Sequence, residues 1–227
     1  MRKKRTIKKP CGKKVYSLVV DGETEKWYFQ LKKSHEELST INIRPDLPVK
    51  KKLHEQFEYV KEQANHADKV IWLVDFDTIL KENRERKQGE KSIIKEFQQY
   101  KSQLEKYENI EVCVNTPCLE FWLLLHFKST SRFYSSCERV TRDLKESSYL
   151  LSDYKKTEKY YKKRDNDIYK KLMPFLATAR TNARNNGQFD SNNPETGIAE
   201  MWKIFDLFDN NHHNNDQQRC TKSKKQH

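Results

Sequence analysis

The sequence predicts an α/β fold: a mostly parallel sheet flanked by helices, with a helical layer or subdomain at the C-terminal end. Three observations predict it. Short, nearly continuous apolar runs alternate with amphipathic stretches, the runs have the length of strands, and they disappear after residue 133. Strands that are apolar on both sides are typical of a parallel sheet whose crossover connections are helices.

The expected strands lie at 15–20, 41–43, 69–76 and 110–114. The first, VYSLVV, is rich in β-branched residues and stops at Asp21-Gly22. The run INI at 41–43 is weaker, and Arg44-Pro45 is expected to end it. KVIWLVDF at 69–76 is the strongest, with acids only at its C-terminal end.

Helices are expected between and after these strands. The first begins near Thr24, which can cap it, and the others are expected at 49–66, 93–107, 118–127, 135–150, 153–183 and 193–208. The helix at 118–127 is apolar on nearly every side, and the one at 153–183 is expected to break near Pro174. His126 is expected to be a satisfied core histidine, and the polar stretch 81–91 a loop or a frayed helix start.

Charge divides the chain into a body and two arms. The net charge is +12, and residues 1–14 contribute eight Lys or Arg without an acid, while 210–227 contribute +3. We therefore expect a basic disordered arm at 1–14, an α/β core at 15–132, a helical part packed on it at 133–209, and a disordered tail at 210–227. The arms could attract nucleic-acid phosphates without regard to sequence, or only aid solubility, and composition leaves both open.

Composition also bounds the location of the protein. The longest apolar run is too short to span a bilayer, so we expect no membrane association. Five scattered cysteines without a C-x-x-C pair suit a reducing cytoplasm, and structural zinc is not expected. Homo-oligomerisation is compatible with the sequence.

Carboxylates gather at the ends of two predicted strands. Asp21 follows the first strand, with Glu25 shortly after it, and Asp75 and Asp77 close the strongest one, where strand alternation would point both the same way. Each acid alone can be a cap or turn residue. If the two strands are neighbours, however, the acids converge, and bound Mg²⁺ or Mn²⁺ would keep them ionised. A two-metal site of this kind is common in phosphodiester cleavage.

The stretches VVDGETEKWYF, DKVIWLVDFD and NTPCLEFWLLLHF, with NPETGIAEMWKIF near the end, resemble the RloB-like family over about 15–208. The resemblance implies a Toprim-like fold, related to the Toprim domains of OLD nucleases and to the nuclease halves of the AbiL and PARIS phage-defence pairs. It also implies a Mg²⁺-dependent endonuclease that acts on DNA or RNA, tRNA included, as the effector of an anti-phage system with an ATPase partner.

Carried over to this chain, the resemblance assigns the metal ligands to Asp21, Glu25, Asp75 and Asp77. Asp21 stands where the family usually has Glu, one methylene longer, so its carboxylate would sit about 1.5 Å further back. The alternative is therefore a non-catalytic Toprim-like binding or regulatory subunit of an ATPase-containing defence complex.

Glu120 joins the candidate catalytic residues. It lies within the most apolar helix and needs a partner there, either the metal cluster or a base such as Arg180 or Arg184. The mixture of Lys and Tyr at 154–171 fits either core packing by the tyrosines or a nucleic-acid surface. The candidate phosphate contacts are Lys155, Lys156, Lys162, Lys163, Arg164, Arg180 and Arg184.

Overall fold

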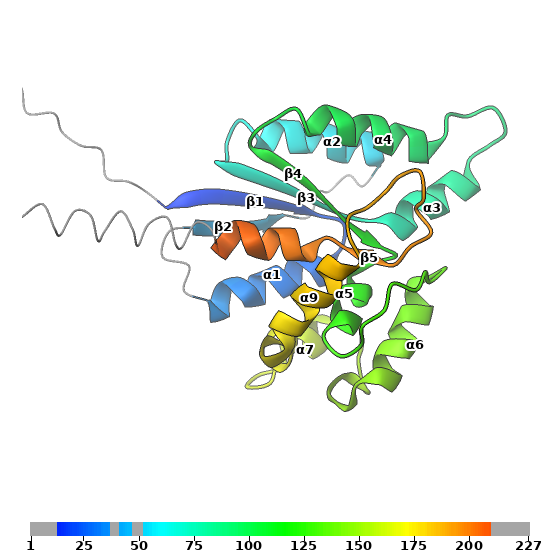
Figure 1. Ribbon diagram of the computed structural model, residues 1–227. Helices are drawn as coiled ribbons and strands as arrows, with labels where there is room; N and C mark the ends of the chain where they lie inside the picture. The colour runs from blue at the N-terminus through cyan, green and yellow to red at the C-terminus, as the bar shows by residue number, and fades with distance from the viewer. Residues whose placement is uncertain (1–12, 37–40, 47–51, 210–227) are drawn as a thin grey trace, which may run out of the picture.

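The computed structural model describes residues 13–36, 41–46 and 52–209, in which a sheet is covered by helices on both faces (Figure 1). The strands are β1 (Lys14–Val20), β2 (Ile41–Asp46), β3 (Lys69–Asp75), β4 (Ile110–Thr116) and β5 (Ile198–Ala199). Their order is β2-β1-β3-β4-β5, in which the first four are parallel and β5 is antiparallel to β4. The α/β fold with a mostly parallel sheet is therefore confirmed.

Two strands differ from expectation. β2 continues through Pro45, which pairs with Leu18, so the end expected at Arg44-Pro45 is wrong. A proline is tolerated there because β2 lies at the edge of the sheet, where its missing N–H costs no ladder bond. Strands were expected to disappear after 133, yet Ile198 and Ala199 pair with Thr116 and Asn115. A strand of two residues is too short to leave a hydrophobic pattern.

The first five helices follow the parallel strands along the chain, with both α3 and α4 between β3 and β4. They are α1 (Glu23–His35), α2 (Leu53–Gln63), α3 (Phe76–Glu85), α4 (Ile93–Leu104) and α5 (Leu119–Leu125). Gly22, not Thr24, holds the N-cap position of α1, so the cap expected from Thr24 is wrong. The stretch 81–85 is the end of α3, not a loop. The expected start of the second helix, at 49–51, lies outside the described residues.

The C-terminal part is a set of short helices. They are α6 (Cys137–Ser147), η1 (Tyr149–Leu151), α7 (Glu158–Tyr161), α8 (Ile168–Leu172), η2 (Met173–Phe175) and α9 (Leu176–Asn185), followed by a helix over 201–209. The helix expected over 153–183 is thus broken well before Pro174. Thr157 and Asp167 each cap a new helix by accepting a backbone N–H, and Asp165 between them has a positive φ of 64°.

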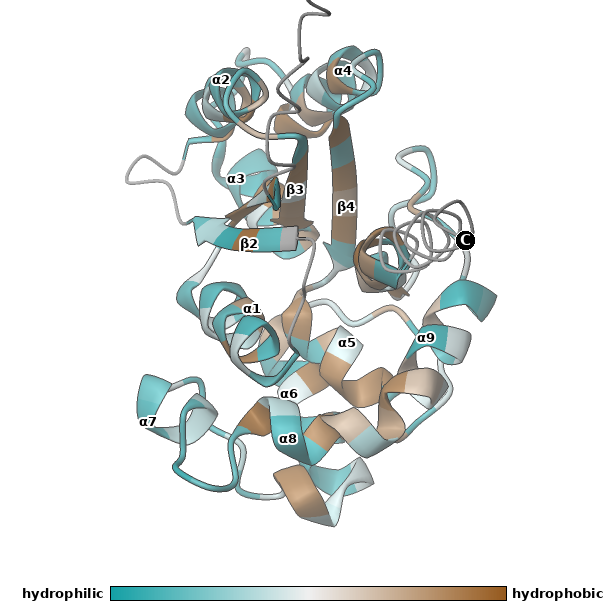
Figure 2. Ribbon diagram, turned by 90° about the vertical axis from the view of Figure 1, so that its left-hand side faces the viewer, coloured by the Kyte–Doolittle hydropathy of each residue, from teal (hydrophilic) through white to brown (hydrophobic). Residues whose placement is uncertain are grey.

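The sheet separates two hydrophobic cores. One face packs against α2, α3 and α4 around Trp72 and Phe97. The other packs against α1, α5 and the C-terminal helices around Leu73 and Trp122, so residues from before and after 133 share one core. Figure 2 shows the apolar strands β3 and β4 running past α2 and α4.

The segments 1–12 and 210–227, where the basic arm and the tail were expected, lie outside the described residues. Among the helices within the described ranges, none has the length and apolar character needed to cross a membrane.

Candidate metal centre

Five carboxylates gather where β1, β3 and β4 end, because β1 and β3 are neighbours in the sheet. Asp21 follows β1 and Asp75 ends β3, while the other three lie in the first turns of the helices that follow these strands. The carboxyl ends of parallel strands meet at one edge, which is where ligand sites form in such sheets. The set is Asp21, Glu25, Asp75, Asp77 and Glu120.

Asp75 and Asp77 reach this edge by different routes. The sequence pattern placed both on one strand, but α3 begins at Phe76, so strand alternation does not apply to Asp77 and that expectation was wrong. The Asp77 backbone N–H donates to the Pro117 carbonyl (3.1 Å), which ties the start of α3 to the end of β4. The two acids remain close enough for the charge of Asp77 to raise the pKa of Asp75.

Mutual repulsion and burial shift the acids strongly. Burial, then the charges of Glu120 and Asp21, raises the pKa of Glu25 to about 7. Burial, then Glu25 and Asp21, raises the pKa of Asp75 well above its usual range. Burial likewise raises the pKa of Asp77 to about 6. A cation at this edge would therefore stabilise the ionised forms that the fold alone disfavours.

Gly22 allows the carboxylate of Glu25 to fold back against the start of α1. A Cβ at Gly22 would lie 2.5 Å from Glu25 Oε2, closer than two such atoms approach. The glycine has an extended backbone, with φ −140°, so close approach and not an unusual turn requires it. Thr24 Oγ1 lies 3.1 Å from Glu25 Oε2, to which it donates a hydrogen bond.

Asp21 is held by two side chains from α2 and α3, which cover the face of the sheet opposite α1. Gln56 Nε2 donates to its Oδ1 (3.2 Å), and Thr78 Oγ1 donates to its Oδ2 (3.1 Å). Glu82 lines the same small hollow, and burial, then the charge of Asp21, raises the pKa of Glu82. The sequence does not single out Glu82, because the polar stretch around it is typical of a loop or a frayed helix start.

Asp75 is oriented by the end of β4. The Leu119 N–H donates to its Oδ2 (3.3 Å) and Asn115 Nδ2 to its Oδ1 (3.5 Å). Within the described part of the chain, Asn115 Oδ1 and Thr116 Oγ1 are buried without a hydrogen-bond partner. Carboxylates beside unpartnered neutral oxygens are the ligand set that Mg²⁺ and Mn²⁺ prefer, so the residues present fit such an ion. Asn115 could have been found by extending the strand-end rule to β4.

Glu120 is fully buried and has partners that the sequence did not suggest. Tyr154 OH donates to its Oε1 (2.6 Å) and is itself 2.7 Å from Tyr161 OH, while Lys156 Nζ lies 2.8 Å from Oε2. The pairing with Arg180 or Arg184 that we considered is therefore wrong. Both tyrosines are buried, so they combine core packing with a polar role.

The predicted phosphate contacts fall into separate groups. Lys155, Lys163 and Arg164 are exposed, and Lys162 is ion-paired with Glu158 (2.7 Å). These positions stay predictions.

The two predicted arginines are already engaged with acids. Arg180 pairs with Asp209 (2.6 Å) and with Asp206, and Arg184 pairs with Asp206 (2.5 Å). A phosphate would have to compete with these carboxylates for both guanidinium groups.

His126 is buried, with its Nδ1 3.0 Å from the Trp122 carbonyl, and burial lowers its pKa to about 4. The predicted core position is confirmed, but the ring is not fully satisfied, because its Nε2 is buried without a hydrogen-bond partner among the described residues.

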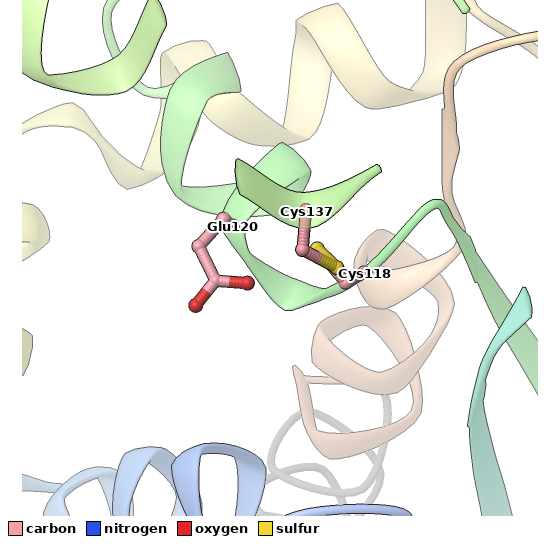
Figure 3. A group of neighbouring side chains, drawn as sticks. All are labelled: Cys118, Glu120 and Cys137. Carbon is pink, nitrogen blue, oxygen red and sulfur yellow. A yellow bond between two sulfur atoms is a disulfide. The ribbon is translucent and has the colours of Figure 1, made fainter. Parts of the chain in front are cut away.

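A disulfide lies at the border of the acidic cluster (Figure 3). It joins Cys118, at the N-cap of α5, to Cys137, the first residue of α6, and the cysteine spacing did not predict this pairing. Cys137 Sγ also lies 2.8 Å from Asp77 Oδ2. Ligand atoms of Cys118, Glu120 and Cys137 lie within 4.8 Å of one another, but sulfurs joined to each other lack the thiolate charge that a metal needs.

A family model described as RloB-like protein matches residues 16–207. The chain belongs to the RloB-like family. All five acids of this RloB-like protein fall within the matched region, as do Tyr154 and Lys156, which contact Glu120. Comparison with curated proteins and with solved structures found no match.

Proposed function

We propose that this RloB-like protein is a Mg²⁺- or Mn²⁺-dependent nuclease that hydrolyses phosphodiester bonds in DNA or RNA. One observation carries the proposal. Acids with raised pKa values converge at the carboxyl ends of adjacent parallel strands, beside a buried amide oxygen of Asn115 that lacks a hydrogen-bond partner in the described residues. Perturbed carboxylates gathered at such an edge are typical of a functional site.

Asp21, Glu25, Asp75 and Asp77 would hold one or two ions, with Asn115 Oδ1 as a neutral oxygen ligand. The bound ion would activate water and stabilise the charge that develops on the scissile phosphate. The backbone N–H of Leu119 holds the Asp75 carboxylate in place.

Glu120, on α5, and Lys156, in the loop between η1 and α7, would support the same reaction. Tyr154 and Lys156 each hold one oxygen of the Glu120 carboxylate. The Lys156 side chain is 46% exposed, so its ammonium can also meet a substrate phosphate. Lys156 thus keeps the phosphate-binding role that the sequence predicted for it.

The role in the cell follows from the family resemblance. We propose that the nuclease is the effector of an anti-phage defence system, activated through an ATPase partner, and that tRNA is among the substrates to be tried. The assignment of a Toprim-like fold also rests on this family resemblance.

The experiment replaces Asp75 and Asp77 together by Ala and measures cleavage of single-stranded DNA, duplex DNA and tRNA with Mg²⁺ or with EDTA. We expect wild-type cleavage to need the metal and the double variant to lose it at least about 100-fold, because several kcal/mol of charge stabilisation are removed. Glu108→Gln is the matched control, since this exposed acid precedes β4 at the opposite edge of the sheet. Full activity of the double variant would sink the proposal.

The second candidate is a non-catalytic binding or regulatory subunit. It is favoured by Asp21, which is shorter than the usual Glu and whose two oxygens already accept hydrogen bonds from Gln56 and Thr78. Calorimetry separates the two functions. Absence of Mg²⁺ and Mn²⁺ binding at millimolar concentration favours the regulatory subunit, and metal binding that Asp75→Asn abolishes favours the nuclease.

A further inference from the structure

A second polar site lies beside the acids, in an open pocket between the segment 132–134 and α6. It has a volume of about 420 Å³ and is lined by Arg132, Tyr134, Arg139, Arg142, Asp143 and Glu146. The candidate phosphate contacts named from the sequence include none of these residues.

The charges in this pocket do not cancel. Within the described ranges, no ion pair or side-chain hydrogen bond engages the guanidinium groups of Arg132, Arg139 and Arg142, and all three residues are exposed. The Asp143 carboxylate is already held by Lys128, at 2.8 and 2.9 Å, and by Ser147 and Tyr134. Glu146 is the other acid of the lining, so the pocket has a surplus of positive charge.

The three guanidinium groups approach the pocket from two sides. Arg139 and Arg142 are three residues apart on α6 and therefore share one helix face. Arg132 lies on the facing segment, with its guanidinium carbon 5.3 Å from the centre of the Tyr134 ring. Planar groups with several N–H donors suit the oxygens of a phosphate, which two or three of them can hold together.

Helix α6 connects this pocket to the acids. It begins at Cys137, whose Sγ lies 2.8 Å from Asp77 Oδ2. At a rise of 1.5 Å per residue, Arg139 and Arg142 follow about 3 and 8 Å further along the helix axis. A nucleic-acid strand carries one phosphate per roughly 3.4 Å of duplex axis. A strand positioned at the acids could therefore reach the pocket with a phosphate a few nucleotides away.

We propose that Arg132, Arg139 and Arg142 bind a backbone phosphate of the nucleic-acid strand, close to the bond that is cleaved at the carboxylates. This rests on the proposed function for the identity of the strand. Arg180 and Arg184, by contrast, are paired with Asp206 and Asp209, and they stay predicted phosphate contacts of the sequence.

The test measures binding of a fluorescent single-stranded oligonucleotide by anisotropy in EDTA over a range of salt concentrations. For Arg139→Gln with Arg142→Gln, we expect affinity at 0.1 M salt to fall about tenfold and the slope of log K against log salt to fall by about 1–2. The matched control is Lys95→Gln with Lys106→Gln, which removes the same charge from exposed positions at the other face of the sheet. Thermal unfolding verifies that both variants are folded.

An equal loss of affinity in the lysine control would overturn the site, because it would show only a general charge effect. Inorganic phosphate distinguishes a strand from a free anion. If only the wild type binds inorganic phosphate while both proteins bind the oligonucleotide equally, the pocket holds a free anion and the proposal is wrong.

Cleavage with Mg²⁺ is measured separately. Strand binding that needs the arginines, without cleavage by the wild type, would reject the nuclease and retain this site. Cleavage by the wild type, together with unchanged strand binding by the arginine variant, would retain the nuclease and reject this arginine site.

Discussion

The two faces of the sheet are packed by different kinds of side chain. The face covered by α2 and α4 is packed by aliphatic side chains around a group of aromatic rings, in which Phe97 lies 5.9–6.1 Å between ring centres from Trp72, Phe76 and Phe189. The face covered by α1 and α5 includes charged groups in its interior: Glu25 and Lys32 are almost fully buried, and Glu120 completely.

Two of these three buried charges have an oppositely charged neighbour. Lys32 is ion-paired with Glu36 and lies over the Phe205 ring, with its Nζ 4.5 Å from the ring centre. Glu120 has Tyr154 and Lys156. Glu25 has Thr24 but also faces other acids, so burial disfavours its charge. Both faces therefore supply apolar burial, and the second face also keeps charged groups in place at a cost in stability.

The largest effect is expected from a core substitution on the face covered by α2 and α4. Phe97→Ala should lower the free energy of unfolding by about 4 kcal/mol, because it leaves a cavity between Trp72 and Phe189. Urea denaturation measures the loss, and calorimetry on the folded fraction should show unchanged Mg²⁺ affinity. Tyr107→Ala, at a 44% exposed ring, is the control. A loss below about 1 kcal/mol for Phe97→Ala would contradict the role of this core.

The next effect concerns the covalent link on the second face. Reducing the Cys118–Cys137 bond, which closes a loop across 19 positions, should lower the free energy of unfolding by about 3 kcal/mol, because the unfolded chain regains conformational freedom. Urea denaturation with and without a thiol reductant measures it. Cys118→Ser with Cys137→Ser should reproduce the loss and no longer respond to the reductant. An unchanged midpoint in both cases would show that the bond does not restrain the fold.

The smallest effect is the pH dependence of the free energy of unfolding, which comes from the buried acids of the second face. The pKa of Glu25 is about 7 in the folded protein against 4.5 for an ordinary Glu, so the folded state binds this proton more tightly than the unfolded state. Stability without metal should therefore fall as pH rises from 5 to 8, by about 2 kcal/mol. Urea midpoints in EDTA at the two pH values measure it.

Two comparisons isolate the share of Glu25 in that pH dependence, to which Asp75 and Asp77 also contribute because their pKa values are raised as well. Glu25→Gln is uncharged at both pH values and should reduce the dependence, and Mg²⁺ at pH 8 should restore the wild type by pairing with the ionised acids. Unchanged pH dependence in Glu25→Gln would place its origin elsewhere.

Some features could be predicted because they depend on local pattern. The run VIWLV predicts β3, and acids directly after two strong strands predict a site where those strands end. Asp21 and Asp75 meet because parallel neighbours end at the same edge. Asp77 was assigned to the same edge for the wrong reason, since residues 76 and 77 already belong to a helix. Where a strand gives way to a helix without a loop, the change of period leaves little trace in the sequence.

The sequence by itself determined the family, the parallel α/β order and the acids from β1, β3 and their following helices. These follow from short-range hydrophobic periods and from motifs that are each about ten residues long. Only the tertiary structure decided which distant side chains pair with the charged groups. Lys156 and Tyr154 contact Glu120, Gln56 contacts Asp21, and Asp206 contacts Arg180. Partners of a buried charge are selected by the packing of whole helices, and a contact across 20 to 40 residues of chain leaves no periodic signal in a single sequence.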